Sequence, residues 1–314
     1  MRILVFIFIS INFLFALKDL SPTYTLKASG NVQALFYEKT KLYAASDNGV
    51  VEIFDTNTKA KIKTIKIPKI KDFMGDIIDP KVYSIDKIDN KLLIVSQGMR
   101  GYRDLWIYEN DKLEKAIDIK KKYYIQKASF INKDTILLGL LSNQMIVYDI
   151  VNKKVLNSIQ VSTSSFSHFM MDEDRGSFAT TDESGIVRVF YANTLTLKKE
   201  IPSKNVDKVF KLDFKKHKIL TAGQDRRSVF YDNRSSYYLE FGFLLYSCAL
   251  SADASIGAVA YNEENDILVF DTNTQNKLYR LTGSEATLNE IIFISKDELF
   301  SSSDHNNIHF WKLK

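Results

Sequence analysis

The chain has 314 residues, of which 45% are hydrophobic and 26% are charged, and its formal net charge is +5 at pH 7. This composition indicates a folded globular protein with an ample core. The 12 Gly and 4 Pro are too few for a collagen-like or Gly/Pro-rich disordered chain, and the 21 Phe and 16 Tyr favour β-sheet. The positive charges are scattered, which argues against a nucleic-acid-binding protein. The single cysteine, Cys248, excludes an intramolecular disulfide and a Cys-rich metal site.

Residues 1–16 have the pattern of a secretory signal peptide. Arg2 precedes an uncharged apolar run of fifteen residues, which at about 1.5 Å per residue is too short for a hydrocarbon core of about 30 Å. Cleavage is expected after Ala16, although Leu14 stands where a small residue is preferred, so an uncleaved anchor is the alternative. No Arg-Arg pair precedes the run, which favours the general secretory route. We therefore predict a periplasmic protein whose mature chain, residues 17–314, has no transmembrane segment.

The remaining sequence repeats a short motif seven times. Each copy is a polar turn followed by an apolar strand that ends near an aromatic residue or an aromatic–acid pair. The seven predicted strands are residues 50–55, 105–109, 145–149, 186–191, 228–232, 266–271 and 308–312. The intervals between their last residues are 54, 40, 42, 41, 39 and 41. A period near 40 with four short strands per unit is typical of WD40 propellers, so we predict an all-β, seven-bladed WD40-like β-propeller.

The interval of 54 residues marks the second blade as irregular. Its extra residues fall in two stretches, 68–80 and 98–104. Strands alternate in direction along a propeller, so both stretches are expected to emerge on the same face, and insertions on one face often mark a binding surface. The candidate partner-binding residues, chosen because their types are enriched in interface cores, are Phe73, Met74, Tyr102 and Arg103. The alternative is that both stretches are tolerated surface insertions.

The two ends of the chain are predicted to meet. The seventh unit stops at Lys314 after its third strand, whereas residues 23–28 have strand character and no partner of their own. We predict that this N-terminal segment is the outer strand of the seventh blade and closes the ring, which removes an exposed sheet edge.

The sequence offers no set of residues for catalysis. His305 and His309 are four residues apart, but they fall in a predicted turn and strand and so lack the helical geometry of an i, i+4 metal clamp. His168, on a predicted inner strand, is expected to be a hydrogen-bonded, partly buried side chain, and Cys248 is expected to fill core space. The aspartates of the turns are expected to shape those turns through side-chain to backbone hydrogen bonds. We therefore predict no catalytic residue, no metal and no cofactor.

Two parts of the sequence resemble known families. Residues 301–304 followed by Trp311 resemble the end of a WD40 repeat, but the Gly-His dipeptide of that family is missing from every blade, so its buried His–Asp network is not expected. The mature chain resembles the accessory propellers (NapL-like) found with periplasmic nitrate reductase, through residues 69–76, 223–227 and 287–293. This resemblance implies a partner in periplasmic nitrate reductase or in its assembly and electron-transfer machinery.

The function expected on these grounds is that of a protein-binding scaffold. We expect a monomeric, non-catalytic periplasmic propeller that docks a protein partner on its enlarged face and supports the assembly or activity of periplasmic nitrate reductase. Two alternatives stay open, a propeller redox enzyme such as a quinone-dependent dehydrogenase and a scaffold for outer-membrane assembly. The enzyme needs convergent ligands and acid–base groups on one face, and the sequence does not display such a set.

Overall fold

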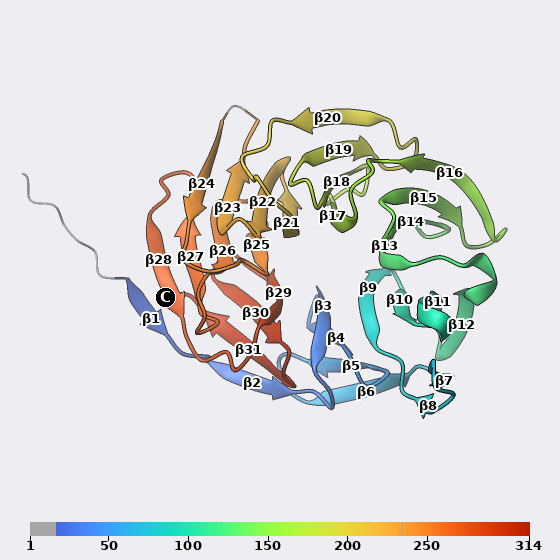
Figure 1. Ribbon diagram of the computed structural model, residues 1–314. Coiled ribbons are helices and arrows are strands. Elements are labelled where there is room, and N and C mark those ends of the chain that lie inside the picture. Colours follow the sequence, from blue (N-terminus) through green and yellow to red (C-terminus); the bar gives the residue numbers. More distant parts are fainter. Residues whose placement is uncertain (1–16, 234) are drawn as a thin grey trace, which may run out of the picture.

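The computed structural model describes residues 17–233 and 235–314. The predicted signal peptide, residues 1–16, lies outside the described residues. The described chain forms seven small sheets that stand around a central axis as the blades of a propeller (Figure 1). The prediction of an all-β, seven-bladed β-propeller is confirmed. Helical structure in this part of the chain is limited to two single turns, η1 (Met99–Gly101) and η2 (Ile119–Lys121).

Each blade has four antiparallel strands, which follow one another from the axis to the rim. The strands of blades 1 to 4 are, blade by blade, β3 (Val32–Glu38), β4 (Lys41–Ser46), β5 (Val50–Asp55) and β6 (Lys61–Lys66); β9 (Val82–Ile88), β10 (Lys91–Gln97), β11 (Arg103–Glu109) and β12 (Lys112–Ile117); β13 (Ile125–Asn132), β14 (Thr135–Leu140), β15 (Gln144–Asp149) and β16 (Lys154–Gln160); β17 (Phe166–Met171), β18 (Ser177–Asp182), β19 (Val187–Tyr191) and β20 (Leu197–Ile201). Those of blades 5 to 7 are β21 (Val209–Lys215), β22 (Lys218–Gly223), β23 (Arg227–Tyr231) and β24 (Ser236–Glu240); β25 (Cys248–Leu250), β26 (Ile256–Ala260), β27 (Ile267–Asp271) and β28 (Lys277–Leu281); β29 (Leu288–Phe293), β30 (Glu298–Ser303), β31 (Asn307–Lys312) and β2 (Tyr24–Lys27).

The repeated motif forms the third strand of every blade. All seven predicted strands are present, each within two residues of its predicted bounds. Most of their aromatic side chains are buried because they pack between blades, as Tyr148 and Phe270 illustrate at 0% exposure, whereas Tyr191 is exposed. Seven clusters of buried hydrophobic residues lie within the described chain, one at each interface between neighbouring blades. The core is therefore divided into seven parts around the ring.

Aspartates shape the turns, as predicted. In blade 4, the Asp182 carboxylate accepts a hydrogen bond of 2.9 Å from the backbone N–H of Ser184. In three other blades, an asparagine that precedes or begins the inner strand donates to the aspartate between the second and third strands. The side-chain amides of Asn31, Asn205 and Asn289 donate to Asp47, Asp225 and Asp304, at 3.1, 3.1 and 2.8 Å. An Asn–Asp bond therefore holds each of these turns to the start of its blade, in a chain without Gly-His dipeptides.

The N-terminal segment closes the ring. Strand β2 pairs antiparallel with β31, with Tyr24 opposite Phe310 and Leu26 opposite Ile308. Leu26 is only 3% exposed and belongs to the cluster between blades 7 and 1. The prediction that this segment is the outer strand of blade 7 is confirmed.

A second N-terminal strand was not predicted. Strand β1 (Lys18–Leu20) pairs in parallel with β28, so blade 6 has five strands. The Asp19 carboxylate also accepts a hydrogen bond of 2.9 Å from Nε of Arg280. A strand of three residues, two of them charged, has too little apolar pattern to be recognised in the sequence.

Both inserted stretches of blade 2 emerge at the same end of its sheet, as predicted, because the backbone N–H of Gln97 donates to the carbonyl of Lys81 at 2.7 Å. The first stretch is more ordered than a loop, since it contains the hairpin β7 (Ile70–Lys71) and β8 (Ile77–Ile78). The second stretch is shorter than predicted. Arg103 and Asp104 already belong to β11, so the insertion ends at residue 102.

Candidate functional site

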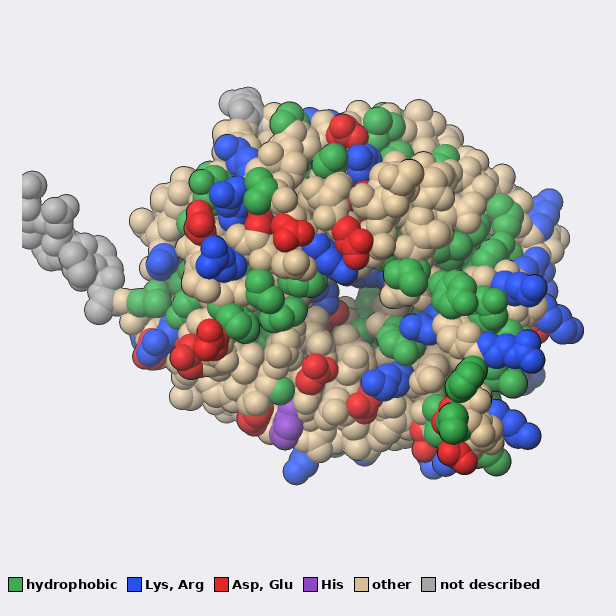
Figure 2. All heavy atoms as spheres, in the orientation of Figure 1, with side chains coloured by type: hydrophobic (Ala, Val, Ile, Leu, Met, Phe, Trp, Pro, Cys, Tyr) green, Lys and Arg blue, Asp and Glu red, His purple; other side chains and the backbone are tan. Residues whose placement is uncertain are grey.

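The tip of the β7–β8 hairpin presents two hydrophobic side chains to solvent. Phe73 is 93% exposed and Met74 is 81% exposed, the highest values among the large hydrophobic residues of the described chain. The tip is nevertheless an ordered turn, because one Asp72 carboxylate oxygen accepts from the backbone N–H groups of Met74 (2.8 Å) and Asp76 (2.9 Å). Hydrophobic side chains lie over this corner of the molecule, beside acidic ones (Figure 2). The exposure of Phe73 and Met74 therefore belongs to a defined structure.

The base of the hairpin is held against the ring. Lys69 and Asp79 form an ion pair of 3.2 Å across it. Pro80 lies against Gly49, in the turn between β4 and β5, where a Cβ atom would come within 3.1 Å of the proline ring. Gly49 also has a φ of +80°, a conformation that a residue with a side chain rarely adopts. The hairpin is thus anchored at its base and free at its tip.

The other two predicted residues, Tyr102 and Arg103, are occupied by contacts within the protein. The centroids of the Tyr102 and Tyr124 rings are 4.6 Å apart. The Arg103 guanidinium lies 4.1 Å from the centre of the Tyr83 ring and donates to the carbonyl of Gly101 at 2.7 Å. The four predicted residues are therefore of two kinds, because Phe73 and Met74 are exposed whereas Tyr102 and Arg103 are partly buried.

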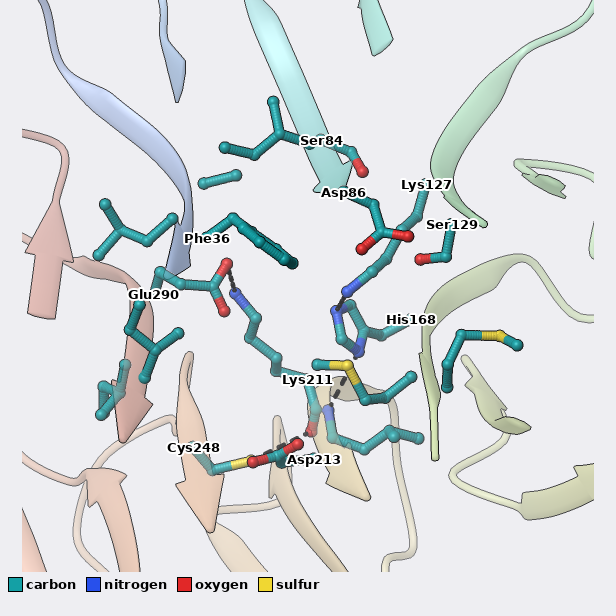
Figure 3. Close-up of a pocket in the computed structure, with 18 of the residues that line it drawn as sticks. Phe36, Ser84, Asp86, Lys127, Ser129, His168, Lys211, Asp213, Cys248 and Glu290 are labelled. Carbon is teal, nitrogen blue, oxygen red and sulfur yellow. Dashed lines mark hydrogen bonds and ion pairs between the residues drawn. The ribbon is translucent and has the colours of Figure 1, made fainter. Parts of the chain in front are cut away.

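The inner strands surround a channel that the sequence analysis did not identify. It contains a cavity of about 440 Å³. Its labelled polar side chains come from six different blades and point toward one another (Figure 3): Ser84 and Asp86 on β9, Lys127 and Ser129 on β13, His168 on β17, Lys211 and Asp213 on β21, Cys248 on β25 and Glu290 on β29. The channel therefore has a charged wall within an otherwise hydrophobic propeller.

Most of these charges are matched. Lys211 forms an ion pair of 2.8 Å with Glu290. Arg175 donates to both carboxylate oxygens of Asp86, at 2.6 and 2.9 Å. The Asp213 carboxylate accepts from the backbone N–H groups of Phe214 and Leu250, each at 2.8 Å. Burial of such charges is tolerated because each has a partner of opposite charge or backbone donors.

Arg175 also ties three blades together at one end of the channel. It lies in the turn between β17 and β18 of blade 4 and bonds Asp86 of blade 2, the carbonyl of Phe130 in blade 3 (2.6 Å) and the carbonyl of Lys87 (3.1 Å). Arg175 itself has a φ of +60°, a left-handed conformation that residues other than glycine rarely adopt. This end of the channel is the one opposite the β7–β8 hairpin, because it carries the turns between first and second strands.

Lys127 differs from the other charged groups of the channel. Its Nζ lies 2.8 Å from Nε2 of His168, and none of the ion pairs found within the described residues includes it. Burial lowers the pKa of Lys127 to about 8, more strongly than the carboxylates raise it. Burial, and then the charges of Lys127 and Lys211, hold the pKa of His168 well below its usual value. His168 is thus a neutral imidazole at physiological pH.

The remaining chemical candidates lie where they were expected. His168 is 7% exposed and hydrogen-bonded, and Cys248 is 2% exposed, so both predictions of buried positions are confirmed. Burial raises the pKa of the Cys248 thiol well above its usual value, which disfavours a reactive thiolate. His305 and His309 lie in a turn and on β31, and both face Glu285, at 3.9 and 3.0 Å. Within the described residues, no group of three or more His, Cys, Asp or Glu side chains is arranged to hold a metal ion.

The channel residues could have been found from a pattern of period two. In a strand, residues two apart share a face. Three inner strands carry polar residues at that spacing, Ser84/Asp86, Lys127/Ser129 and Lys211/Asp213, so their shared face had to point into the channel rather than into the hydrophobic interfaces.

Comparison of the chain with models of protein families and with curated proteins finds no match. The structure shows a seven-bladed β-propeller, which is consistent with a propeller of the WD40 type, and neither comparison supports the predicted resemblance to the accessory propellers of nitrate reductase. In the ranges 17–233 and 235–314, no helix is long and apolar enough to cross a membrane.

Proposed function

We propose that this protein is a non-catalytic propeller that binds a protein partner through the tip of its β7–β8 hairpin. The observation that carries this proposal is the exposure of Phe73 and Met74 on an ordered turn. Two large hydrophobic side chains in water contribute nothing to the folded state, since the favourable free energy comes from removing such surface from water. Their presence at an anchored tip is explained if a partner covers them.

The chemistry of the tip describes the partner surface. Aromatic and Met side chains are enriched in the cores of protein interfaces, where they fill pockets. Asp72 and Asp76 flank Phe73 and Met74, and Asp76 is exposed. Lys71, next to Asp72, is also exposed, so the partner surface that fits is a hydrophobic pocket with a rim of mixed charge. Tyr102 and Arg103 stabilise the connection between β10 and β11, which lies on the same face as the hairpin, through their contacts with Tyr124 and with the carbonyl of Gly101.

The identity of the partner is proposed from the resemblance of the sequence to the NapL-like accessory propellers. The proposed partner is periplasmic nitrate reductase or a component of its assembly and electron-transfer machinery. The protein would bind it as a monomer, after export to the periplasm by the general secretory route. The signal-like pattern of residues 1–16 supports that location. A propeller suits this task because a rigid ring holds an added hairpin in a fixed orientation.

The test is a direct binding measurement between the purified protein and purified subunits of periplasmic nitrate reductase. A Phe73→Ala/Met74→Ala variant should weaken binding at least tenfold, equivalent to about 1.4 kcal/mol. The matched control is Val151→Ala, because Val151 is also an exposed hydrophobic residue (63% exposed) and lies in the turn after β15 on the opposite face. The turn residues Asn57, Asn152 and Asn273 on that face provide further controls.

Three outcomes would contradict the proposal in different ways. Normal binding by the hairpin variant with loss in the Val151 variant would place the interface on the opposite face. Normal binding by both would exclude the hairpin tip. Absence of binding by the unchanged protein would exclude nitrate reductase as the partner.

A further inference from the structure

The amine of Lys127 is in an unusual hydrogen-bonding position. Two other basic groups of the channel, Lys211 and Arg175, are paired with Glu290 and Asp86. Lys127 instead has His168 as its hydrogen-bonding neighbour, at 2.8 Å. The charged groups that surround it are Asp86, Lys211, Asp213 and Glu290, and the net effect of the site is set by burial rather than by these charges.

The two hydrogen bonds of His168 can both be made in only one arrangement of the hydrogen atoms, the one in which Lys127 is neutral. The backbone N–H of Leu212 donates to Nδ1 of His168 at 3.4 Å. A neutral imidazole has a single N–H, so when Nδ1 accepts, Nε2 must carry the hydrogen and donate it. The group that receives this hydrogen is Nζ of Lys127, and only a neutral amine has the lone pair to accept it. If Lys127 is protonated, the ring must move its hydrogen to Nδ1 and lose the bond from Leu212.

A neutral lysine amine beside a hydrogen-bond donor is equipped to react with a carbonyl group. The cavity of about 440 Å³ leaves room for a small molecule and is lined on other sides by hydrophobic and aromatic residues such as Phe36, Tyr83 and Met170. Its lining extends along the inner strands from Gln33 and Tyr83 to Tyr37 and Arg175. The site therefore suits a small aldehyde with a hydrophobic body.

We propose that Lys127 captures small aldehydes in the channel as a Schiff base. The lone pair of Nζ forms a bond to the carbonyl carbon while the π electrons of the carbonyl move to its oxygen, toward which Nε2–H of His168 can turn. A proton passes from the nitrogen to this oxygen and gives a carbinolamine. Loss of water then forms the C=N bond. One aldehyde and one amine yield one imine and one water, so no oxidant or reductant takes part.

The test is reductive trapping with an aldehyde probe, for which we choose butanal with sodium cyanoborohydride on the full chain at pH 7.5. Modification of each lysine is followed over time by peptide mass spectrometry. A lysine in water, with a pKa of about 10.4, is only about 0.1% neutral at this pH, whereas a pKa of about 8 leaves about a quarter neutral. The weaker basicity lowers the intrinsic reactivity, so we expect Lys127 to react at least tenfold faster than Lys133, an exposed lysine directly after the same strand.

Lys211 is the control inside the channel, because it is equally enclosed but paired with Glu290; it should stay unmodified. His168→Gln should slow the reaction at Lys127 severalfold, and Lys127→Met should abolish the fast site. Equal rates at Lys127 and Lys133, or modification of Lys211 as fast as of Lys127, would overturn the proposal. The comparisons of Lys127 with Lys133 and with Lys211 are made within the unchanged protein, so they hold even if a variant fails to fold. They are also independent of partner binding, because a Phe73→Ala/Met74→Ala variant should be trapped normally.

Discussion

Blades 2 and 7 are built on the same plan and depart from it in opposite ways. In each, a tryptophan of the third strand donates its Nε1–H to a serine of the second strand, Trp106 to Ser96 and Trp311 to Ser301, both at 2.9 Å. Blade 2 then adds a hairpin to its four strands, whereas blade 7 lacks a strand and takes β2 from the other end of the chain. The repeated interactions therefore lie between the second and third strands, and the variation lies at the rim and on one face.

The two added segments differ most in what their hydrophobic side chains contact. Leu26 of β2 is 3% exposed, whereas Phe73 at the hairpin tip is 93% exposed. The same kind of side chain thus stabilises the ring in one place and remains available to a partner in the other. Substitutions in the two segments should separate stability from binding.

The largest effect is expected at the seam of blade 7. Leu26→Ala should lower the free energy of unfolding by about 2–5 kcal/mol, the usual cost of a buried Leu-to-Ala change, and Leu26→Asp should cost more because it buries an unpaired charge. Urea denaturation measures both. Lys27→Ala on the same strand is the control, since Lys27 is exposed. Deletion of residues 23–28 should also reduce solubility by exposing the edge of β31. Unchanged stability in the deletion and in both Leu26 variants would refute closure of the ring by β2.

The tryptophan pair tests whether blades 2 and 7 are equally strong at their centres. Trp106→Phe and Trp311→Phe each leave a buried serine without its donor, which should cost about 1–3 kcal/mol. The two residues lie in different hydrophobic clusters, so the double variant should show an additive loss to within about 0.5 kcal/mol. A much larger loss for Trp311→Phe would show that the seam weakens blade 7 as a whole.

The smallest effect on stability is expected at the hairpin tip. Phe73→Ser/Met74→Ser should change the free energy of unfolding by no more than about 0.5 kcal/mol, as for other exposed positions. Thermal melts measure this change. The control is Ile67→Ser, which should be clearly destabilising because Ile67, just before the hairpin, is 3% exposed. Loss of stability in the tip variant would mean that the tip packs against the ring, which would remove the basis for its role in binding.

The sequence repeat made the seven blades predictable, whereas most departures from the repeat could not be predicted. Seven third strands could be located because each carries the same aromatic ending over a period near 40, and the unpaired segment at residues 23–28 had only one vacant place to fill. Strand β1 escaped prediction because its three residues pair through backbone bonds and one ion pair, which leave no hydrophobic pattern. Phe73 and Met74 could be selected by residue type. The cation–π contact between Arg103 and Tyr83 could not be predicted, because it depends on the side-chain conformations of residues on two different strands.

The channel shows the same limit for chemistry. His168 was expected to be buried, and it is, but its neighbour Lys127 lies 41 residues away in the chain and one blade away in space. A ring brings one residue from each repeat to its axis, so the groups that meet there are spaced by about one blade length. A group of channel residues contributed by different blades therefore cannot be recognised when each blade's sequence is considered separately.

The position of β1 and β2 imposes an order on folding. Asp19 meets Arg280 across 261 residues of chain, and Tyr24 meets Phe310 in the last strand. In a chain that emerges from its N-terminus, residues 18–27 must therefore wait, unpaired, until blades 6 and 7 have been made. Contacts between residues so distant in sequence form slowly because the intervening chain must be ordered first. In the last step of folding, β1 pairs with β28 and β2 pairs with β31, which closes the ring. A chain that ends before these blades are made cannot close its ring, and it keeps exposed sheet edges that the complete protein lacks.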